Sequence, residues 1–240
     1  MADFVVQAPI VTPAVIARLA RQAGAQAIVP VGSGAPAAWR FPEVAQNDAL
    51  VDAARAAGCD AAFVPEDRRL ADVGVVVLDM DSTLITIECI DEIADMKGLK
   101  PEVAAITAGA MRGEIDFAQS LTQRVALLAG LPVEALERVY AERLRISVGA
   151  ARMLAGFKAA GATTALVSGG FTYFTDRLKA ALPLDVAVAN TLGVDGGRLT
   201  GRIEGPIVDG RAKADTLRAL RNGPGGGLAV AIGDGANDLP

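Results

Sequence analysis

Two aspartates in the first half of the chain have the spacing of a catalytic pair. Asp79 and Asp81 follow the short apolar run Val75–Leu78, which is typical of a buried strand in a parallel sheet. Ligands bind beyond the carboxyl ends of such strands. A carboxylate held there can attack phosphorus, and a second carboxylate can carry the proton of the leaving group. The same residues also fit a strand that ends in an ordinary Asp-Ser-Thr turn or helix cap.

Two further segments could bind a phosphoryl group. Ser168–Gly170 follow an apolar run and precede an expected helix, so their hydroxyl and backbone N–H groups could hydrogen-bond phosphate oxygens. A serine cap followed by glycines in a tight turn gives the same pattern. Lys213 begins a helix after the turn at Asp209 and could neutralise phosphate charge. A lysine at such a position is more often a solvated surface residue.

A third group of polar residues follows the apolar run 228–232. Asp234, Asn237 and Asp238 offer several oxygen atoms within five residues. Hard oxygen ligands suit Mg²⁺, which keeps several waters and uses one or two carboxylates together with substrate phosphate. A metal-free acidic turn is the alternative interpretation of this segment.

Composition narrows the chemistry that is available. The chain has 240 residues, 52% of them hydrophobic, and it contains no histidine. A Ser-His-Asp triad, phosphohistidine chemistry and imidazole-bound metals are therefore excluded. Cys59 and Cys89 are too few for a disulfide framework or a four-thiolate metal site. Catalysis must use carboxylates, hydroxyls, lysine and a metal bound by oxygen.

Charge and hydropathy indicate the class of partner. The net charge of −5 argues against binding to nucleic acid, because such domains present a basic surface. No apolar run approaches the about 18 residues that span a bilayer. The first residues lack the basic region of a secretory signal. We therefore expect a cytoplasmic protein with a small-molecule substrate and no membrane partner.

The elements that must position these residues alternate between strands and helices. Beyond the strand before Asp79, we expect strands at 164–167, 186–189 and 228–232, and helices at 149–160, 171–181 and 211–221. This alternation predicts an α/β fold with a doubly wound, parallel, Rossmann-like sheet. The segment 192–204 is expected to be a polar hairpin.

Two other regions frame this sheet. A long helical stretch at about 91–145, broken by glycines, predicts a helical cap inserted at about 86–146. Residues 1–70 are expected to form a small N-terminal α/β domain ahead of the 71–240 core. Its predicted strands lie at 4–6, 27–31 and 61–64, its helices at 13–23 and 47–57, with a Gly/Pro-rich loop after residue 31.

The ordered segments Asp-x-Asp-x-Thr, strand-end Ser, Lys and Gly-Asp-Gly-x-x-Asp resemble the four motifs of the haloacid dehalogenase superfamily. Within it, the chain is similar to the phosphoserine phosphatases. The similarity runs from about residue 74 to the end and includes the cap segments 88–94, 106–107 with Met111, 117–121 and 124–125. It implies Mg²⁺-dependent hydrolysis of O-phospho-L-serine through an aspartyl phosphate, which is the last step of serine biosynthesis.

The resemblance also implies roles for individual residues. Asp79 would be the nucleophile and Asp81 the general acid and then base. Ser168 and Gly169 would hold the phosphoryl group, with Lys213 steadying its charge. Mg²⁺ would be bound by the side chains of Asp79 and Asp234 and by the backbone carbonyl of Asp81. Asn237 and Asp238 would order the phosphate, Lys213 or the waters on the metal.

Cap residues would supply specificity under the same resemblance. Arg124 would bind the substrate carboxylate and Glu88 its ammonium group. Met111 and Phe117 would close the pocket and exclude water. From the residues alone, Glu88 is a charge at a helix start and Arg124 one end of a weak surface ion pair.

Three alternatives stay open. The chain could hydrolyse another small phosphomonoester within the same superfamily. Relatives continue beyond the position of Pro240, so we also consider a C-terminally shortened, poorly active or non-catalytic fragment that binds Mg²⁺ loosely. Residues 1–70 could have a regulatory, amino-acid-sensing role.

Overall fold

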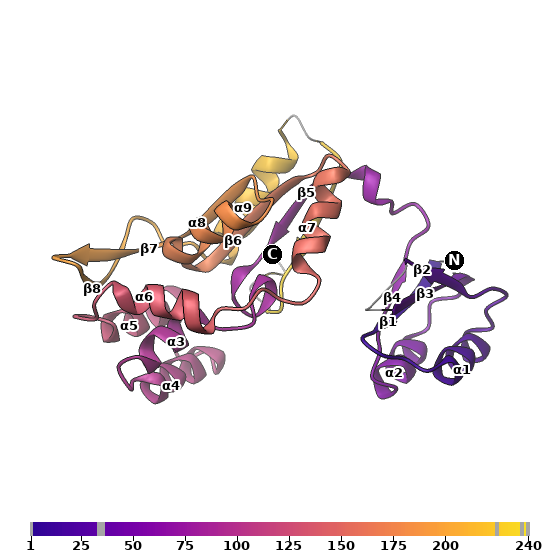
Figure 1. Cartoon of the computed structure of the whole chain (residues 1–240), viewed down its shortest axis with the longest axis horizontal. Helices are drawn as coiled ribbons and strands as arrows, with labels where there is room; N and C mark the ends of the chain where they lie inside the picture. The colour runs from indigo at the N-terminus through magenta and orange to yellow at the C-terminus, as the bar shows by residue number, and fades with distance from the viewer. Residues whose placement is uncertain (1, 33–36, 224–225, 236–237, 239–240) are drawn as a thin grey trace. The chain divides into compact units, whose positions relative to one another are not determined.

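The computed structural model describes residues 2–32, 37–223, 226–235 and 238. The chain divides into two compact units, Met1–Arg69 and Leu70–Pro240 (Figure 1). Each unit has its own hydrophobic core and is described separately. No helix among the described residues combines the length and the apolar character that crossing a membrane requires.

The first unit is a four-stranded antiparallel sheet with two helices. The elements follow one another as β1 (Ala2–Ala8), α1 (Pro13–Ala23), β2 (Val29–Val31), β3 (Ala37–Val44), α2 (Asp48–Ala56) and β4 (Asp60–Val64). The strand order in space is β2-β3-β1-β4. Thr12 and Asn47 cap the two helices through their side-chain oxygens. Alternate residues of β1, Phe4 and Val6, are fully buried in the core that the helices cover.

Strand β3 corrects the expectation of a loop after residue 31. Pro42 cannot donate to a strand ladder, and its presence in the sequence disfavours a strand. In the structure the pairing of β1 with β3 shifts between Ala2↔Val44 and Phe4↔Phe41, so Pro42 and Glu43 form a bulge. Glu43 has a φ of +56° there. The strand tolerates proline because the bulge needs no ladder bond at that position.

The second unit contains a five-stranded, mostly parallel sheet in the order β8-β7-β6-β5-β9. The strands are β5 (Val73–Leu78), β6 (Thr163–Phe171), β7 (Val186–Asp195), β8 (Arg198–Glu204) and β9 (Leu228–Ile232). β5, β6, β7 and β9 are parallel, and β8 runs antiparallel to β7. The expected hairpin at 192–204 is therefore part of this sheet, so the sheet is mixed and not wholly parallel.

Helices cover both faces of this sheet. Val76 and Leu78 pack in one cluster with residues of α7 (Ala150–Ala159) and α8 (Thr172–Ala181). Val75 and Val77 pack in another with residues of α9 (Gly210–Arg221). Because both sets of alternate residues are buried, β5 is apolar along its whole length.

A helical insertion separates β5 from α7. It contains α3 (Cys89–Asp95), α4 (Lys100–Met111), α5 (Phe117–Leu127), α6 (Glu134–Arg138) and the π-helical turn η3 (Val139–Arg143). The chain enters and leaves the insertion side by side, since Ile85 and Ile146 form an antiparallel bridge. The breaks at Gly98, Gly113 and Gly130 all have positive φ, which glycine adopts without steric cost. Arg143 joins α3 to η3 through ion pairs with Glu92 and Asp95.

Candidate active site

The carboxyl ends of three neighbouring strands bring the predicted site residues together. Asp79 directly follows β5, Ser168 lies near the end of β6, and Asp234 lies two residues beyond β9. The Asp79 backbone N–H donates to the Ile232 carbonyl at 2.9 Å, which continues the β5–β9 pairing past the last strand residue. The site is thus fixed by strand register, as expected for parallel strands that end at one edge.

Asp79 is a buried carboxylate held by two donors. Its Oδ1 accepts from the Met80 backbone N–H at 2.6 Å, and its Oδ2 accepts from Lys213 Nζ at 2.6 Å. Lys213 also donates to Asp238 Oδ1 at 2.7 Å. The exposed fractions of Asp79 and Lys213 are only 9% and 8%. Lys213 is therefore a buried counter-ion of the aspartate and not a solvated surface residue.

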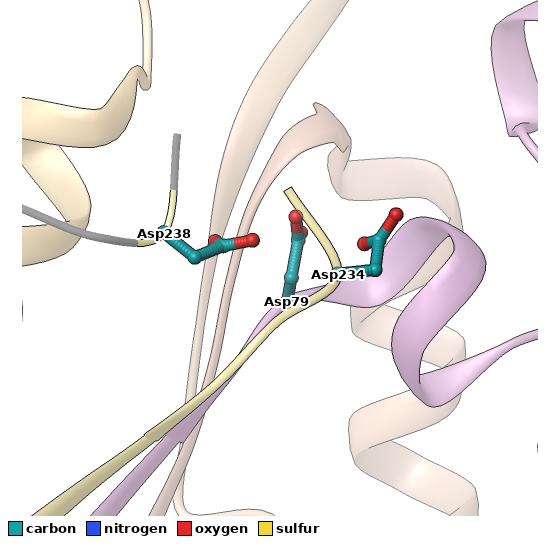
Figure 2. A group of neighbouring side chains, drawn as sticks. All are labelled: Asp79, Asp234 and Asp238. Carbon is teal, nitrogen blue, oxygen red and sulfur yellow. The ribbon is translucent and has the colours of Figure 1, made fainter. Parts of the chain in front are cut away.

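Three carboxylates form a compact acidic cluster. Asp79, Asp234 and Asp238 each offer an oxygen, and these atoms lie within 4.8 Å of one another, with Asp79 between the other two in Figure 2. The Thr83 hydroxyl donates to Asp234 Oδ1 at 2.9 Å. Gly233 leaves the space that the Asp238 carboxylate occupies, because a Cβ there would collide with it. These oxygen donors fit a hard divalent cation.

The cluster differs from the predicted metal ligands in one respect. Asp238, which we expected to order groups around the metal, contributes its own carboxylate to the cluster. The carboxylate of Asp81 is not a member of this cluster of described residues. A metal contact through the Asp81 backbone carbonyl stays a prediction.

Asp81 has the protonation behaviour of an acid–base group. Burial raises its pKa to about 7, and repulsion from Glu88 and Asp79 adds to this, while hydrogen bonding from Cys89 opposes it. The Cys89 backbone N–H donates to Asp81 Oδ1 at 3.3 Å. A carboxyl group that titrates near neutrality can both give and take a proton at physiological pH.

Ser168 and its glycines line the site next to Asp81. The Ser168 side chain is 1% exposed, and its Oγ accepts from the Gly170 backbone N–H at 3.0 Å. A Cβ at Gly170 would lie 2.5 Å from the Met80 methyl group and 3.0 Å from Asp81 Oδ2. Only glycine therefore lets this loop approach the aspartate motif so closely.

A pocket of about 140 Å³ connects these groups to the insertion. Its walls from the insertion include Glu88, Phe117 and Arg124. The Phe117 ring covers Gly169, where a Cβ would lie 2.8 Å from its Cζ atom. The full lining is Asp79, Asp81, Glu88, Ile90, Phe117, Leu121, Arg124, Ser168, Gly169, Gly170, Phe171 and Asp234.

Glu88 and Arg124 line this pocket with opposite charges. The Ser82 hydroxyl donates to Glu88 Oε1 at 2.6 Å, from a backbone with a φ of +53°. Burial raises the pKa of Glu88, and repulsion from neighbouring aspartates adds to the effect. Arg124 Nε donates to the Ser120 carbonyl at 3.3 Å. Burial lowers the pKa of Arg124, and nearby carboxylates oppose this shift.

Three described residues of the predicted site, Met111, Lys213 and Asp238, do not line this pocket. Lys213 and Asp238 still belong to the site, because Lys213 Nζ donates to both Asp79 and Asp238. Met111, at the end of α4, is 85% exposed, so the structure does not support its predicted role in closing the pocket. Asn237 lies outside the described residues.

One buried residue of the site was missed by the sequence interpretation. Asn190 on β7 is 1% exposed and hydrogen-bonds both Gly169 and Val208. Its signal was a polar residue directly after the apolar run 186–189. That is the same strand-end signal that identified Asp79 and Ser168.

Comparison with known proteins now identifies the family. Residues 76–240 match the family model of haloacid dehalogenase-like hydrolases. The chain belongs to this family. The matched residues include the aspartate pair, the serine, the lysine and the acidic cluster.

Individual members of the haloacid dehalogenase-like hydrolases are similar to this chain in sequence and in structure. A phosphoserine phosphatase of Polaromonas sp. is 51% identical over 181 residues, which are 72% of this chain and 77% of the relative. A probable phosphoserine phosphatase from Vibrio cholerae, solved without ligand, is 38% identical with a TM-score of 0.83, and the match covers 99% of this chain and 74% of that one. A structure described as a phospho-aspartyl intermediate analogue of phosphoserine phosphatase is 41% identical with a TM-score of 0.65, covering 70% and 81%.

Proposed function

We propose that this hydrolase is a phosphoserine phosphatase that converts O-phospho-L-serine and water into L-serine and phosphate, the last step of serine biosynthesis. The observation that carries the proposal is one pocket that joins Asp79, Asp81 and Ser168 to Glu88 and Arg124. The first group suits phosphoryl transfer, and the second suits the ammonium and carboxylate groups of an amino acid. Relatives named phosphoserine phosphatase, about half identical to this chain, support the same substrate.

The first chemical step forms an aspartyl phosphate. A carboxylate oxygen of Asp79 attacks phosphorus, and the bond from phosphorus to the serine oxygen breaks. Protonated Asp81 gives its proton to that oxygen, so L-serine leaves as the alcohol. A pKa of about 7 leaves a large fraction of Asp81 protonated at neutral pH. Ser168 Oγ and the neighbouring backbone amides hold the phosphoryl oxygens, and Lys213 offsets the added negative charge.

The second step hydrolyses this intermediate. Ionised Asp81 accepts a proton from water, and the resulting oxygen attacks phosphorus. The bond between phosphorus and Asp79 breaks, which restores the Asp79 carboxylate and releases phosphate. Asp81 ends the cycle protonated, as it began. These residues can perform both steps without histidine, because phosphoryl transfer depends on positioning and charge stabilisation.

Asp79 and Asp234 would hold Mg²⁺, with Asp238 next to them in the same cluster. The cation would neutralise charge between the aspartates and the phosphate and thereby assist in-line displacement. Thr83 fixes the Asp234 carboxylate through its hydroxyl, and Lys213 fixes that of Asp238. Asp81 keeps its carboxylate outside this cluster and so stays available for proton transfer.

Substrate choice rests on the charged pair in the pocket. Glu88, held by Ser82, would receive the substrate ammonium group. Arg124 would receive the carboxylate through two parallel hydrogen bonds. Phe117, lying over Gly169, would exclude water from the reacting groups.

A comparison of two phosphomonoesters tests this assignment. Phosphoethanolamine has the ammonium group of phosphoserine but lacks the carboxylate. We expect Arg124→Ala to lower kcat/KM for O-phospho-L-serine by about tenfold or more, since a charge-assisted hydrogen bond contributes about 1.5–3 kcal/mol. The same substitution should change kcat/KM for phosphoethanolamine little. Phosphate release in the presence of Mg²⁺ measures both.

The matched control is Arg138→Ala, which removes an exposed arginine of the insertion from an ion pair with Glu142. It should leave both substrates unaffected. An equal loss with both substrates in Arg124→Ala would contradict carboxylate recognition. Faster hydrolysis of an unrelated sugar phosphate or nucleotide by the wild-type chain would contradict the proposed substrate.

A further inference from the structure

Asn190 is a buried amide that connects two separate loops at the phosphate side of the pocket. Its Nδ2 donates to the Gly169 carbonyl at 2.8 Å and to the Val208 carbonyl at 3.5 Å. Its Oδ1 accepts from the Val208 backbone N–H at 2.8 Å. These partners also fix the orientation of the amide, because the carbonyls can only accept and the N–H can only donate.

The first loop is the irregular end of β6, and it carries the serine expected to bind phosphate. Gly169 follows Ser168 directly, and the Gly170 N–H donates to Ser168 Oγ. The pairing between β6 and β7 is interrupted between Val167 and Phe171. The ladder therefore does not hold this stretch to β7, and the Asn190 side chain replaces the missing backbone contacts there.

The second loop leads to the lysine. Val208 precedes Asp209, whose Oδ1 accepts from the Ala212 N–H at 2.9 Å and so caps α9. The Lys213 N–H donates to the Asp209 carbonyl at 3.0 Å. Lys213 thus lies in the first turn of α9, four residues after Asp209. Any displacement of Val208 would shift the start of this helix and with it the lysine.

We propose that Asn190 is a positioning residue that sets the separation between Ser168 and Lys213, the two side chains that would hold opposite sides of the phosphoryl group. The inference rests on the proposed function and names a further residue for it. Asn190 does not line the pocket, so it acts through Gly169 and Val208 and not by contact with substrate. Glu88 and Arg124 line the same pocket but come from the insertion, and they belong to neither loop.

Because the residues for the phosphate part and for the amino-acid part of the substrate are on different segments, the two binding affinities should respond differently to loss of Asn190. Loss of the Asn190 bridge should weaken binding of the phosphate part of the substrate and leave binding of the amino-acid part intact. A residue that merely stabilises the fold would lower both affinities together, or neither. Inorganic phosphate and L-serine are therefore suitable separate probes.

The experiment compares Asn190→Asp in the full chain with wild type. Aspartate keeps an oxygen for the Val208 N–H, but its other oxygen faces the Gly169 carbonyl without a hydrogen to donate. Calorimetric titrations with inorganic phosphate and with L-serine, both with Mg²⁺, give the two affinities. The control is Asn222→Asp, the same change at an exposed residue after α9.

We expect Asn190→Asp to weaken phosphate binding by about tenfold or more, while L-serine affinity stays within about twofold. Loss of kcat/KM for O-phospho-L-serine should follow the loss of phosphate affinity. Unchanged phosphate affinity, or an equal fall for both ligands, would overturn the proposal. If Asn190→Asp does not fold, Asn190→Ser is titrated in the same way and interpreted by the same criteria.

The experiments distinguish a failure of the proposed function from a failure of the inference about Asn190. If the wild-type chain neither binds L-serine nor hydrolyses phosphoserine, the substrate assignment is wrong. Phosphate binding to wild type and Asn190→Asp still measures whether Asn190 positions the two loops, because that titration requires no turnover.

Discussion

At the scale of single residues, the site depends on charges that are buried beside one another. Asp79 and Lys213 are both nearly inaccessible to water and directly paired. Removing one partner would leave an uncompensated buried charge. Asp81 forms no direct ion pair in the described part of the chain, and burial favours its neutral form. The same environment that suits Asp81 for proton transfer should reduce the stability of the folded protein at high pH.

The variant Asp81→Asn tests this loss of stability at high pH. The pKa of Asp81 is about 7 in the folded chain and about 4 when unfolded. Between these values the folded protein binds a proton that the unfolded chain has lost, so the free energy of unfolding falls as pH rises. Asparagine does not titrate. The stability gain of Asp81→Asn should therefore grow from pH 4 to pH 7 and then level off, at about 2 kcal/mol for this partly accessible group.

Urea unfolding of both proteins at a series of pH values measures this gain. Asp81→Asn should also release no phosphate, because asparagine cannot exchange the proton. A constant stability difference from pH 4 to pH 8 would show that Asp81 has an ordinary pKa.

Sequence alone predicted that polar residues after three apolar strands lie close together. Asp79, Ser168 and Asp234 each stand at a strand end, where the topology forces proximity. The contacts made by Ser82 and Asn190 could not be deduced in this way. They depend on a turn with positive φ and on two loops that are distant in sequence. Met111 is exposed and does not line the pocket, so its role in closing the pocket stays a prediction.

At the scale of elements, the insertion is held at its two ends and by hydrogen bonds to β8. Its ends pair with each other through Ile85 and Ile146. Its segment 130–133 also bonds to β8, since the Gly130 N–H donates to the Leu199 carbonyl and the Leu199 N–H donates to the Leu131 carbonyl, both at 2.8 Å. β8 would otherwise expose an edge of the sheet, so these bonds protect it.

Gly201 permits β8 to approach α5. It has a φ of +74°, and a Cβ there would lie 2.8 Å from the Ala129 Cβ and 3.1 Å from the Ala126 carbonyl. We expect Gly201→Ala to lower the free energy of unfolding by about 3 kcal/mol, through both backbone strain and overpacking. Gly197→Ala is the matched control, because Gly197 has a similar φ of +76° with open space around it.

The control should cost about 1 kcal/mol through backbone strain alone. The difference between the two variants in urea unfolding isolates the contact between β8 and α5. Equal losses would mean that the contact has no energetic role.

The elements themselves were largely predictable, and the exceptions have local causes. Helices α1, α2, α7, α8 and α9 were expected within about one residue of their observed ends, because apolar spacing is a strong signal. Side-chain caps at Thr12, Asn47 and Asp209 add to this signal for α1, α2 and α9. Strand β3 was missed because Pro42 argues against a strand unless a bulge is known. The joining of β8 to the sheet was missed because hairpin residues alternate in polarity whether or not a third strand lies alongside.

At the scale of the whole molecule, all described pocket residues belong to the second unit, Leu70–Pro240. The first unit has its own buried core of Phe4, Val6 and Phe41 among others. We therefore expect a chain of residues 70–240 to fold and to release phosphate from O-phospho-L-serine with the kcat of the full chain. Steady-state assays of both, with and without added L-serine, measure this.

These assays also address the proposed regulatory role of residues 1–70. A difference in inhibition by L-serine between the two chains would support that role, and identical kinetics would remove it. Loss of activity in 70–240 despite a cooperative unfolding transition would contradict the assignment of the site to the second unit alone.

The covalent intermediate on Asp79 is the central claim, and its chemical trapping tests it most directly. The enzyme is mixed with O-phospho-L-serine and Mg²⁺, quenched during turnover and treated with borohydride, which reduces an acyl phosphate to an alcohol. Mass spectrometry of the peptide that contains residue 79 should then show homoserine in place of Asp79, and Asp79→Asn should give neither this product nor phosphate. Phosphate release that continues in Asp79→Asn, or a reduced residue at any other carboxylate, would contradict the account.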